Sequence, residues 1–367
     1  MIVERVVLHE YELSLSAPFS TSVRTIESLP RIIVEIHTDV GLVGIGESAP
    51  NYEVTGESGA GTAELLEEVM APLLVGENPL HMEQLHSQLT EVHGAPAAHA
   101  GIDIALCDLR AKYADLPLYQ YFGGAKDEPT VTVPEVISMG TPESMAKKAQ
   151  QGTDSGCRQI KIKVGDDPTA DKERIEAVKD AIPDDVSLKA DVNQGWGDAK
   201  TTLQVLSDVG DCLDVIEQPV HEDAISDMQT VRDRTAVPLM ADEPVRSPRD
   251  AMNLFKRGAA DMLNVKLMKS GGITPAVRLN AVAEADGRPV QLGSMIEGGI
   301  GTAAGVHYVA AFENVIWNEL VGPFMTENHF TDLQLDDFTV ATEGPGLGVT
   351  IDHDELARGR NTRRVID

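Results

Sequence analysis

The 367-residue sequence contains only three cysteines, Cys107, Cys157 and Cys212. Because they are odd in number and lie far apart in apolar or mixed segments, we expect buried thiols and not a disulfide set or a cysteine metal site. No apolar run approaches membrane-spanning length, and the first residues lack the basic start and apolar core of a signal peptide. These absences predict a cytoplasmic protein.

Basic residues are also scarce, with 30 Lys and Arg against 59 Asp and Glu, which gives a formal net charge of -29. Such a charge disfavours nucleic acid and anionic membranes as partners. An acidic surface with little lysine and 4% aromatic residues predicts adaptation to high salt, where cations screen self-repulsion. An ordinary acidic cytosolic enzyme is the alternative.

Lysine is absent before Lys112 and after Lys269. Within the lysine-containing stretch, residues 159–164 read Gln-Ile-Lys-Ile-Lys-Val, and alternation in a strand turns Lys161 and Lys163 to one face. A solvent-facing edge strand would show the same alternation. The sequence that follows favours a functional interpretation.

Short apolar runs end in Asp191, Glu217 and Asp242, and the next run ends in Lys266. From Lys163 onward these residues are 28, 26, 25 and 24 positions apart. A period of about 25, with helix-length segments between the runs, is typical of consecutive βα units. We therefore predict an α/β protein with a (β/α)8 barrel, in which strand ends carry the catalytic groups.

Three carboxylates at one end of a barrel would repel one another and raise their pKa values unless a cation neutralised them. Asp191, Glu217 and Asp242 are therefore candidate ligands of Mg²⁺, with Mn²⁺ as the alternative, because no His or Cys lies at these positions. Asn193 and Glu243 could orient these ligands.

The lysines are expected to flank the metal from opposite sides of the barrel. Burial, a nearby cation and a second ammonium group all favour the neutral amine that a base requires. Two such lysines could remove a proton from an α-carbon and return one, while the metal stabilises the enediolate formed between these steps. The substrate would be a small anionic carboxylate.

These motifs resemble those of the enolase superfamily and, within it, the muconate lactonizing enzyme subgroup. The matching segments are Lys161-Ile-Lys163, Asp191-Val-Asn193, Ile216-Glu217-Gln-Pro219, Ala241-Asp242-Glu243 and Asn264-Val-Lys266. The resemblance implies an enolase-type mechanism, with a lysine base and an enediolate stabilised by Mg²⁺. It also implies a homo-oligomer.

The resemblance extends to both ends of the chain. Residues 1–128 are expected to form an N-terminal α+β capping domain, with a first strand near residues 2–15, a hairpin through residues 31–47 and a helix over residues 97–112. Residues 129–322 would form the (β/α)7β-type barrel domain, and residues 323–367 would return to the capping domain.

The reaction within the subgroup is less constrained. The segments around Glu297 and Glu319 look most like those of muconate and chloromuconate cycloisomerases. Dipeptide epimerases of the L-Ala-D/L-Glu type carry an Asp-x-Asp on the eighth strand that binds the substrate ammonium, whereas this chain has Glu319 and Val321 there. Residues 49–57 resemble the epimerase loop. Cycloisomerase is the favoured prediction, and epimerase the alternative.

In the lactonizing reaction Lys163 would donate a proton, supported by Lys161, with Lys266 on the opposite face. In an epimerase Lys163 and Lys266 would exchange the roles of acid and base. Glu297, Glu319, Thr21 and Arg24 are candidate substrate-binding residues, the last two in a loop resembling one that closes over substrate. A barrel that only binds a carboxylate, or a two-carboxylate glycosidase, would leave the paired lysines unexplained.

Overall fold

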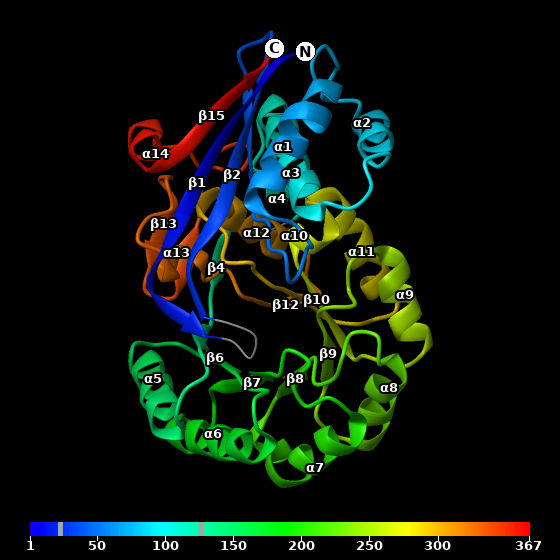
Figure 1. The fold of residues 1–367 in the computed structure, drawn as a ribbon, viewed down its shortest axis with the longest axis vertical. Helices are drawn as coiled ribbons and strands as arrows, with labels where there is room; N and C mark the ends of the chain where they lie inside the picture. The colour runs from blue at the N-terminus through cyan, green and yellow to red at the C-terminus, as the bar shows by residue number, and fades with distance from the viewer. Residues whose placement is uncertain (21–24, 125–127) are drawn as a thin grey trace.

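The computed structural model describes residues 1–20, 25–124 and 128–367. A strand-rich part, which contains both termini, lies against one side of a parallel barrel (Figure 1). The predicted fold class is confirmed: a (β/α)8-type barrel carries an N-terminal α+β domain. No helix in the described residues is both long and apolar enough to cross a bilayer.

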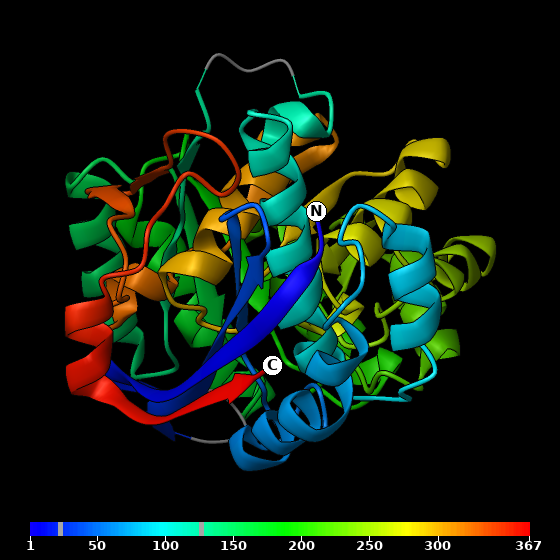
Figure 2. The same cartoon turned by 90° about the horizontal axis from the view of Figure 1, so that it is seen from above.

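The N-terminal part is built on a four-stranded antiparallel sheet in the order β15-β1-β2-β3. Its strands are β1 (Val3–Ser20), β2 (Thr25–Thr38), β3 (Val43–Ser48) and β15 (Arg360–Ile366). The last strand pairs antiparallel with β1, so the C-terminal segment closes one edge of this sheet (Figure 2).

Helices cover one face of this sheet. They are α1 (Gly59–Leu65), continued by a π-helical turn (Leu66–Met70) and a 3₁₀ turn (Ala71–Leu73), α2 (Met82–Leu89), α3 (Pro96–Tyr113) and α4 (Leu118–Tyr121). α3 packs directly on β3 because Gly44 and Gly46 have no side chains there. A Cβ on Gly46 would lie 2.0 Å from the Gly101 carbonyl oxygen.

The barrel sheet contains eight parallel strands in the order β12-β11-β10-β9-β8-β7-β6-β5. They are β5 (Glu135–Ile137), β6 (Gln159–Lys163), β7 (Ser187–Asp191), β8 (Val215–Glu217), β9 (Leu239–Ala241), β10 (Met262–Val265), β11 (Val290–Leu292) and β12 (Val315–Asn318). At the ends of this order, the Asn318 side chain donates to the carbonyl oxygen of Thr132, just before β5.

Helices connect these strands around the outside (Figure 1). They are α5 (Pro142–Asp154), α6 (Pro168–Ala181), α7 (Ala199–Val209) with a 3₁₀ turn (Gly210–Cys212), α8 (Ile225–Arg234), α9 (Pro248–Lys256), α10 (Leu267–Ser270), α11 (Ile273–Ala285) and α12 (Gly299–Ala311). Thr141, Asp167, Asp198 and Ser247 cap four of them by accepting backbone N–H bonds. Three of these caps precede proline, which suits the first helical turn, so the starts are encoded locally.

The segment after β12 returns toward the N-terminal sheet. It contains α13 (Gly322–Met325), β13 (Gln334–Asp336), β14 (Thr339–Ala341) and α14 (His353–Gly359) before β15. β14 pairs with β4 (Thr130–Thr132) at the start of the barrel region. Residues from the barrel and the N-terminal part share one hydrophobic core. The domain boundaries stay a prediction.

Candidate active site

Strand register brings Lys163, Asp191 and Glu217 into one row across β6, β7 and β8. Neighbouring parallel strands lie about 4.8 Å apart, so charges in a row are held within reach of each other. Lys163 Nζ lies 2.5 Å from Asp191 Oδ2. Asp191 and Glu217 are fully buried. The row therefore places a lysine and two carboxylates inside the barrel.

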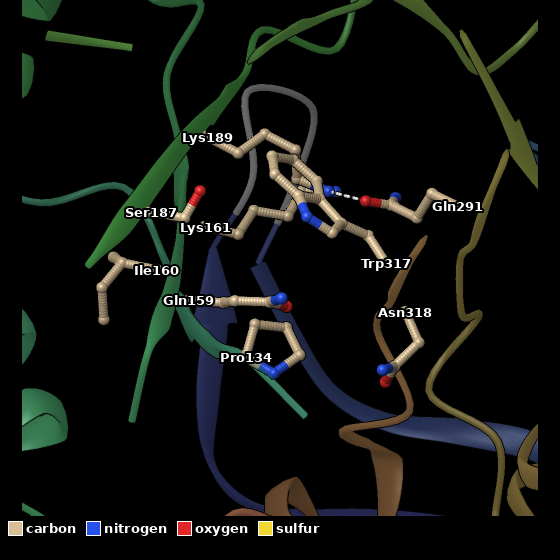
Figure 3. Close-up of a pocket in the computed structure, with 9 residues that line it drawn as sticks. All are labelled: Pro134, Gln159, Ile160, Lys161, Ser187, Lys189, Gln291, Trp317 and Asn318. Atoms are coloured by element: carbon tan, nitrogen blue, oxygen red, sulfur yellow. Dashed lines mark hydrogen bonds between the residues drawn. The ribbon is translucent and has the colours of Figure 1, made fainter. Parts of the chain in front are cut away.

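Lys161 lies two residues earlier on β6 and points into the same interior. Its Nζ is 2.8 Å from Asp191 Oδ2, 3.1 Å from Glu217 Oε2 and 2.5 Å from Glu319 Oε1. Lys189 on β7 reaches the same group: its Nζ is 2.5 Å from Glu319 Oε1 and donates to the Gln291 side chain (Figure 3). This set of residues fills the barrel interior with paired charges.

Asp242 follows β9 and is paired by two lysines. Lys266 Nζ is 2.8 Å from Asp242 Oδ2, and Lys269, one helical turn further along, donates to Oδ1 and to the Asp242 carbonyl oxygen. Since β6 and β10 are four steps apart in an eight-stranded order, Lys163 and Lys266 belong to opposite sides of the barrel. Both are partly shielded, with side chains 12% and 10% exposed.

The buried charges stabilise one another. Burial by itself would lower the pKa of Lys161, but Asp191, Glu217 and Glu319 raise it well above its ordinary value. Burial would also lower the pKa of Lys266, but Asp242 raises it above its ordinary value. Burial would raise the pKa of Asp242, but the two lysines beside it lower that pKa to about 2. The pairing of opposite charges therefore favours the ammonium and carboxylate forms of these groups.

Two predicted orienting residues differ in their contacts. Asn193 donates its backbone N–H to Asp191 Oδ1 at 3.0 Å, and its side-chain oxygen accepts from Lys163 at 3.1 Å. Glu243 accepts from Gln194 at 3.1 Å, and burial, followed by repulsion from Asp242 and Asp191, raises its pKa to about 7.

Among the described residues, the two predicted substrate-binding glutamates have different partners. Glu319 is buried with Lys161 and Lys189, whereas Glu297 accepts from the Ser294 hydroxyl and from the Met295 backbone N–H at 3.0 Å. Thr21 and Arg24 lie outside the described residues.

Four residues of the charged interior were not predicted as site residues from the sequence: Lys189, Lys269, Asn264 and Gln291. Lys189 was detectable, because alternation in β7 puts it on the same face as Asp191. Asn264 lies on β10, two residues before Lys266, and donates to Glu217 at 2.7 Å. The alternation rule therefore also places Asn264 on the face of the strand that carries Lys266. Lys269 follows the strand in a short helix, where alternation no longer applies.

Several buried oxygens near these carboxylates are candidate metal ligands. Asn264 Oδ1, Glu217 Oε2 and Glu243 Oε2 are buried without a hydrogen-bond partner among the described residues, although Lys161 and Lys189 lie 3.1 Å from Glu217 Oε2. Such unsatisfied oxygens suit a hard cation. Asp191, Glu217 and Asp242 do not form a group whose ligand atoms all lie within 4.8 Å. Ammonium groups also lie against each of these three carboxylates, which are the candidate ligands of such an ion.

The fold and the charged interior define a class: a barrel enzyme with lysines facing carboxylates. Residues 3–123 match the mandelate racemase/muconate lactonizing enzyme N-terminal domain, and residues 144–355 match the enolase C-terminal domain-like family. The chain therefore belongs to the enolase superfamily, in its mandelate racemase/muconate lactonizing enzyme family.

Its relatives include racemases, epimerases and cycloisomerases. An N-succinyl-L-Arg/Lys racemase of Bacillus cereus is 38% identical, with 97% of each chain covered, and its crystal structure matches with a TM-score of 0.96 over both whole chains. A dipeptide epimerase of Enterococcus faecalis, solved with Mg and L-Leu-L-Tyr, is 33% identical with a TM-score of 0.91, covering 95% of this chain and 100% of that one. A chloromuconate cycloisomerase of Cupriavidus necator is 30% identical, covering 92% and 94%.

These relatives confirm an isomerase of the enolase superfamily. They correct the predicted preference within it: the epimerase alternative is better supported than the cycloisomerase reading, because the racemase and dipeptide epimerases are more similar in sequence than the cycloisomerases. The seventh- and eighth-strand segments had favoured a cycloisomerase, and Glu319 and Val321 at the Asp-x-Asp positions had weakened the epimerase alternative.

Proposed function

We propose that the protein racemises an N-acylated α-amino acid, by moving the α-proton between Lys163 and Lys266. The observation that carries this proposal is the pairing of Glu319. This carboxylate stands where dipeptide epimerases have the first aspartate of the Asp-x-Asp, yet its Oε1 lies 2.5 Å from both Lys161 Nζ and Lys189 Nζ.

Glu319 belongs to a buried cluster in which three carboxylates face three ammonium groups, so the cluster has no net negative charge for a further ammonium. The six residues are Asp191, Glu217, Glu319, Lys161, Lys163 and Lys189. The second aspartate position is occupied by Val321, a buried apolar residue. A free substrate ammonium placed here would be desolvated without a partner, which is costly. An acylated nitrogen carries no charge, so it avoids this cost.

Lys163 and Lys266 are assigned as the acid/base pair because they belong to opposite sides of the barrel and remain partly accessible. One would remove the α-proton from one face, and the other would deliver a proton to the opposite face. Lys161, which is fully buried among Asp191, Glu217 and Glu319, would hold Asp191 and Glu217 in place.

Asp191, Glu217 and Asp242 are assigned as ligands of Mg²⁺, with Asn193 and Glu243 supporting them. A bound Mg²⁺ would supply positive charge next to the substrate carboxylate as that group gains electron density. A divalent cation and a substrate carboxylate together add one positive charge to the interior, which favours loss of a lysine proton and so produces the neutral base. Mn²⁺ is the second candidate ion.

The remaining assignments belong to the same proposal. Glu297, Thr21 and Arg24 stay candidate substrate-binding residues. The net charge of -29 supports adaptation to high salt, and the family supports a homo-oligomer. A cytoplasmic location is part of the same proposal.

A panel of substrates tests this function. N-succinyl and N-acetyl amino acids, L,L-dipeptides and a muconate-type diacid are incubated with the Mg²⁺-loaded enzyme, and α-proton exchange in heavy water or loss of diene absorbance is followed. We expect exchange and racemisation with the N-acyl compounds. Turnover of dipeptides alone would move the assignment to the epimerase candidate, and lactonization of the diacid alone would contradict both.

A variant tests the Glu319 argument directly. Val321→Asp adds a second carboxylate where the Asp-x-Asp has one, so kcat/KM for dipeptides should rise relative to that for N-acyl substrates. Val321→Asn is the matched control, since it has a similar shape without charge. Equal effects of both variants on the ratio would refute the charge argument.

A further inference from the structure

A second group of potential metal ligands lies on the N-terminal sheet, outside the barrel. His9 on β1, Glu35 on β2 and His353 at the start of α14 place their ligand atoms within 4.8 Å of one another. In residues 1–20, 25–124 and 128–367, this is the one group of three His, Cys, Asp or Glu side chains that meets this limit. Two of the ligands are nitrogens, which the barrel carboxylates do not offer.

The distances fit a small ion. His9 Nε2 lies 2.8 Å from Glu35 Oε1, and His353 Nδ1 lies 3.7 Å from the same oxygen. Ligands bound tetrahedrally at about 2.0–2.2 Å lie about 3.3–3.6 Å apart. The two observed separations bracket this range, so modest side-chain shifts would admit an ion between the three ligands.

A further histidine fixes the orientation of Glu35. Arg5 lies 3.2 Å from His37 Nδ1, and because a guanidinium can only donate, this nitrogen must accept. The His37 proton is then on Nε2, which donates to Glu35 Oε2 at 2.8 Å. His37 therefore holds one carboxylate oxygen and leaves Oε1 facing His9 and His353. Outer partners of this kind commonly orient metal ligands.

Burial makes the group more than a surface cluster. His9 is 2% exposed and Glu35 5% exposed, and His9 Nδ1 has no hydrogen-bond partner in the described part of the chain. His353, with a side chain 62% exposed, leaves a route for an ion to enter.

We propose that His9, Glu35 and His353 bind a Zn²⁺-type transition-metal ion, with one coordination position open to water. Two imidazoles and a carboxylate suit Zn²⁺ and similar ions, whereas Mg²⁺ prefers oxygen ligands. The ion joins the first two strands of the chain to α14, which precedes the last strand (Figure 2). Its role is to fasten the C-terminal segment to the N-terminal sheet.

The test uses the full chain, stripped with a chelator and then saturated with Mg²⁺ so that the barrel carboxylates are loaded. Zn²⁺ binding is measured by calorimetry, and Co²⁺ is used as a spectroscopic probe of nitrogen coordination. We expect one equivalent of Zn²⁺ in the wild type, and at least tenfold weaker binding in His9→Gln and His353→Gln. Zn²⁺ should also raise the melting temperature of the wild type but not of His353→Gln.

Two further variants serve as controls. His221 has a side chain equally exposed at 62% and lies 3.6 Å from Asp223, so His221→Gln should bind Zn²⁺ like the wild type. Glu217→Gln, which alters the barrel carboxylates, should also keep the Zn²⁺ site. The readouts do not depend on catalysis, so they stand whichever substrate the enzyme uses.

Three results would overturn the proposal. Wild-type protein that binds no Zn²⁺ would show that the cluster is only a set of ion pairs. Unchanged Zn²⁺ affinity in the exposed-site variant His353→Gln, which removes no buried side chain, would also end it. Loss of Zn²⁺ binding in Glu217→Gln would place the ion in the barrel.

Discussion

Replacing Lys266 by methionine tests whether two lysines act on opposite faces of one α-carbon. β6 and β10 are half a circuit apart in the eight-stranded order, so Lys163 and Lys266 can each approach only one face of a substrate held between them. Methionine keeps the apolar volume of the side chain and removes the amine. Asp242 keeps an ammonium partner in Lys269, so its charge stays compensated.

A positioned acid or base contributes about 10²–10⁴-fold to rate, which corresponds to about 3–5 kcal/mol of transition-state stabilisation. Racemisation needs both lysines, so each single variant should lose it by about that factor. Proton exchange at one face needs only the lysine that remains. Lys266→Met should therefore exchange the α-proton of one enantiomer only, and Lys163→Met that of the other.

The assay follows deuterium uptake from heavy water by NMR, for each enantiomer separately, beside racemisation by polarimetry. Lys256→Met, a substitution of an exposed lysine on α9, is the control and should behave like the wild type. If both variants exchanged the same enantiomer, or if either one exchanged both, the lysines would not face each other across the substrate.

Burial lowers the pKa of His307 to about 4, against about 6.5 in an unfolded chain. Because the native state binds fewer protons than the unfolded state between these pH values, it should lose about 3 kcal/mol of stability as pH falls from 6.5 to 4. Urea unfolding across this range should show a smaller loss in His307→Gln. Gly46→Ala should destabilise the protein by at least about 1–3 kcal/mol, because the new Cβ would meet the Gly101 carbonyl oxygen at 2.0 Å and the Ala105 nitrogen at 2.8 Å; an unchanged melting temperature would contradict this packing. With a net charge of -29, thermal stability should rise between about 0.1 and 1 M KCl, as the screening length falls from about 10 to 3 Å, and a flat response would count against high-salt adaptation.

Much of the site could be predicted because strands impose simple rules. Alternation by two and the repeat of about 25 residues are local properties, and a parallel barrel converts them into convergence at one end. The strand register of the structure agrees with these rules, because it aligns Lys163, Asp191 and Glu217 in one row. Capping residues set the helix starts in the same local way.

The sequence by itself predicted the barrel and lysines on opposite sides of it, because both follow from periods along the chain, whereas the N-terminal domain was expected from the resemblance to a family. Only the tertiary structure decided that Glu319 pairs with Lys161 and Lys189. Glu319 follows β12, which is far in sequence from β6 and β7, and the side chains contact one another across the barrel interior. The tertiary structure also decided that His353 joins His9, because β15 returns to pair with β1. Contacts between segments so far apart in sequence depend on the three-dimensional arrangement of the chain, which local sequence patterns do not predict.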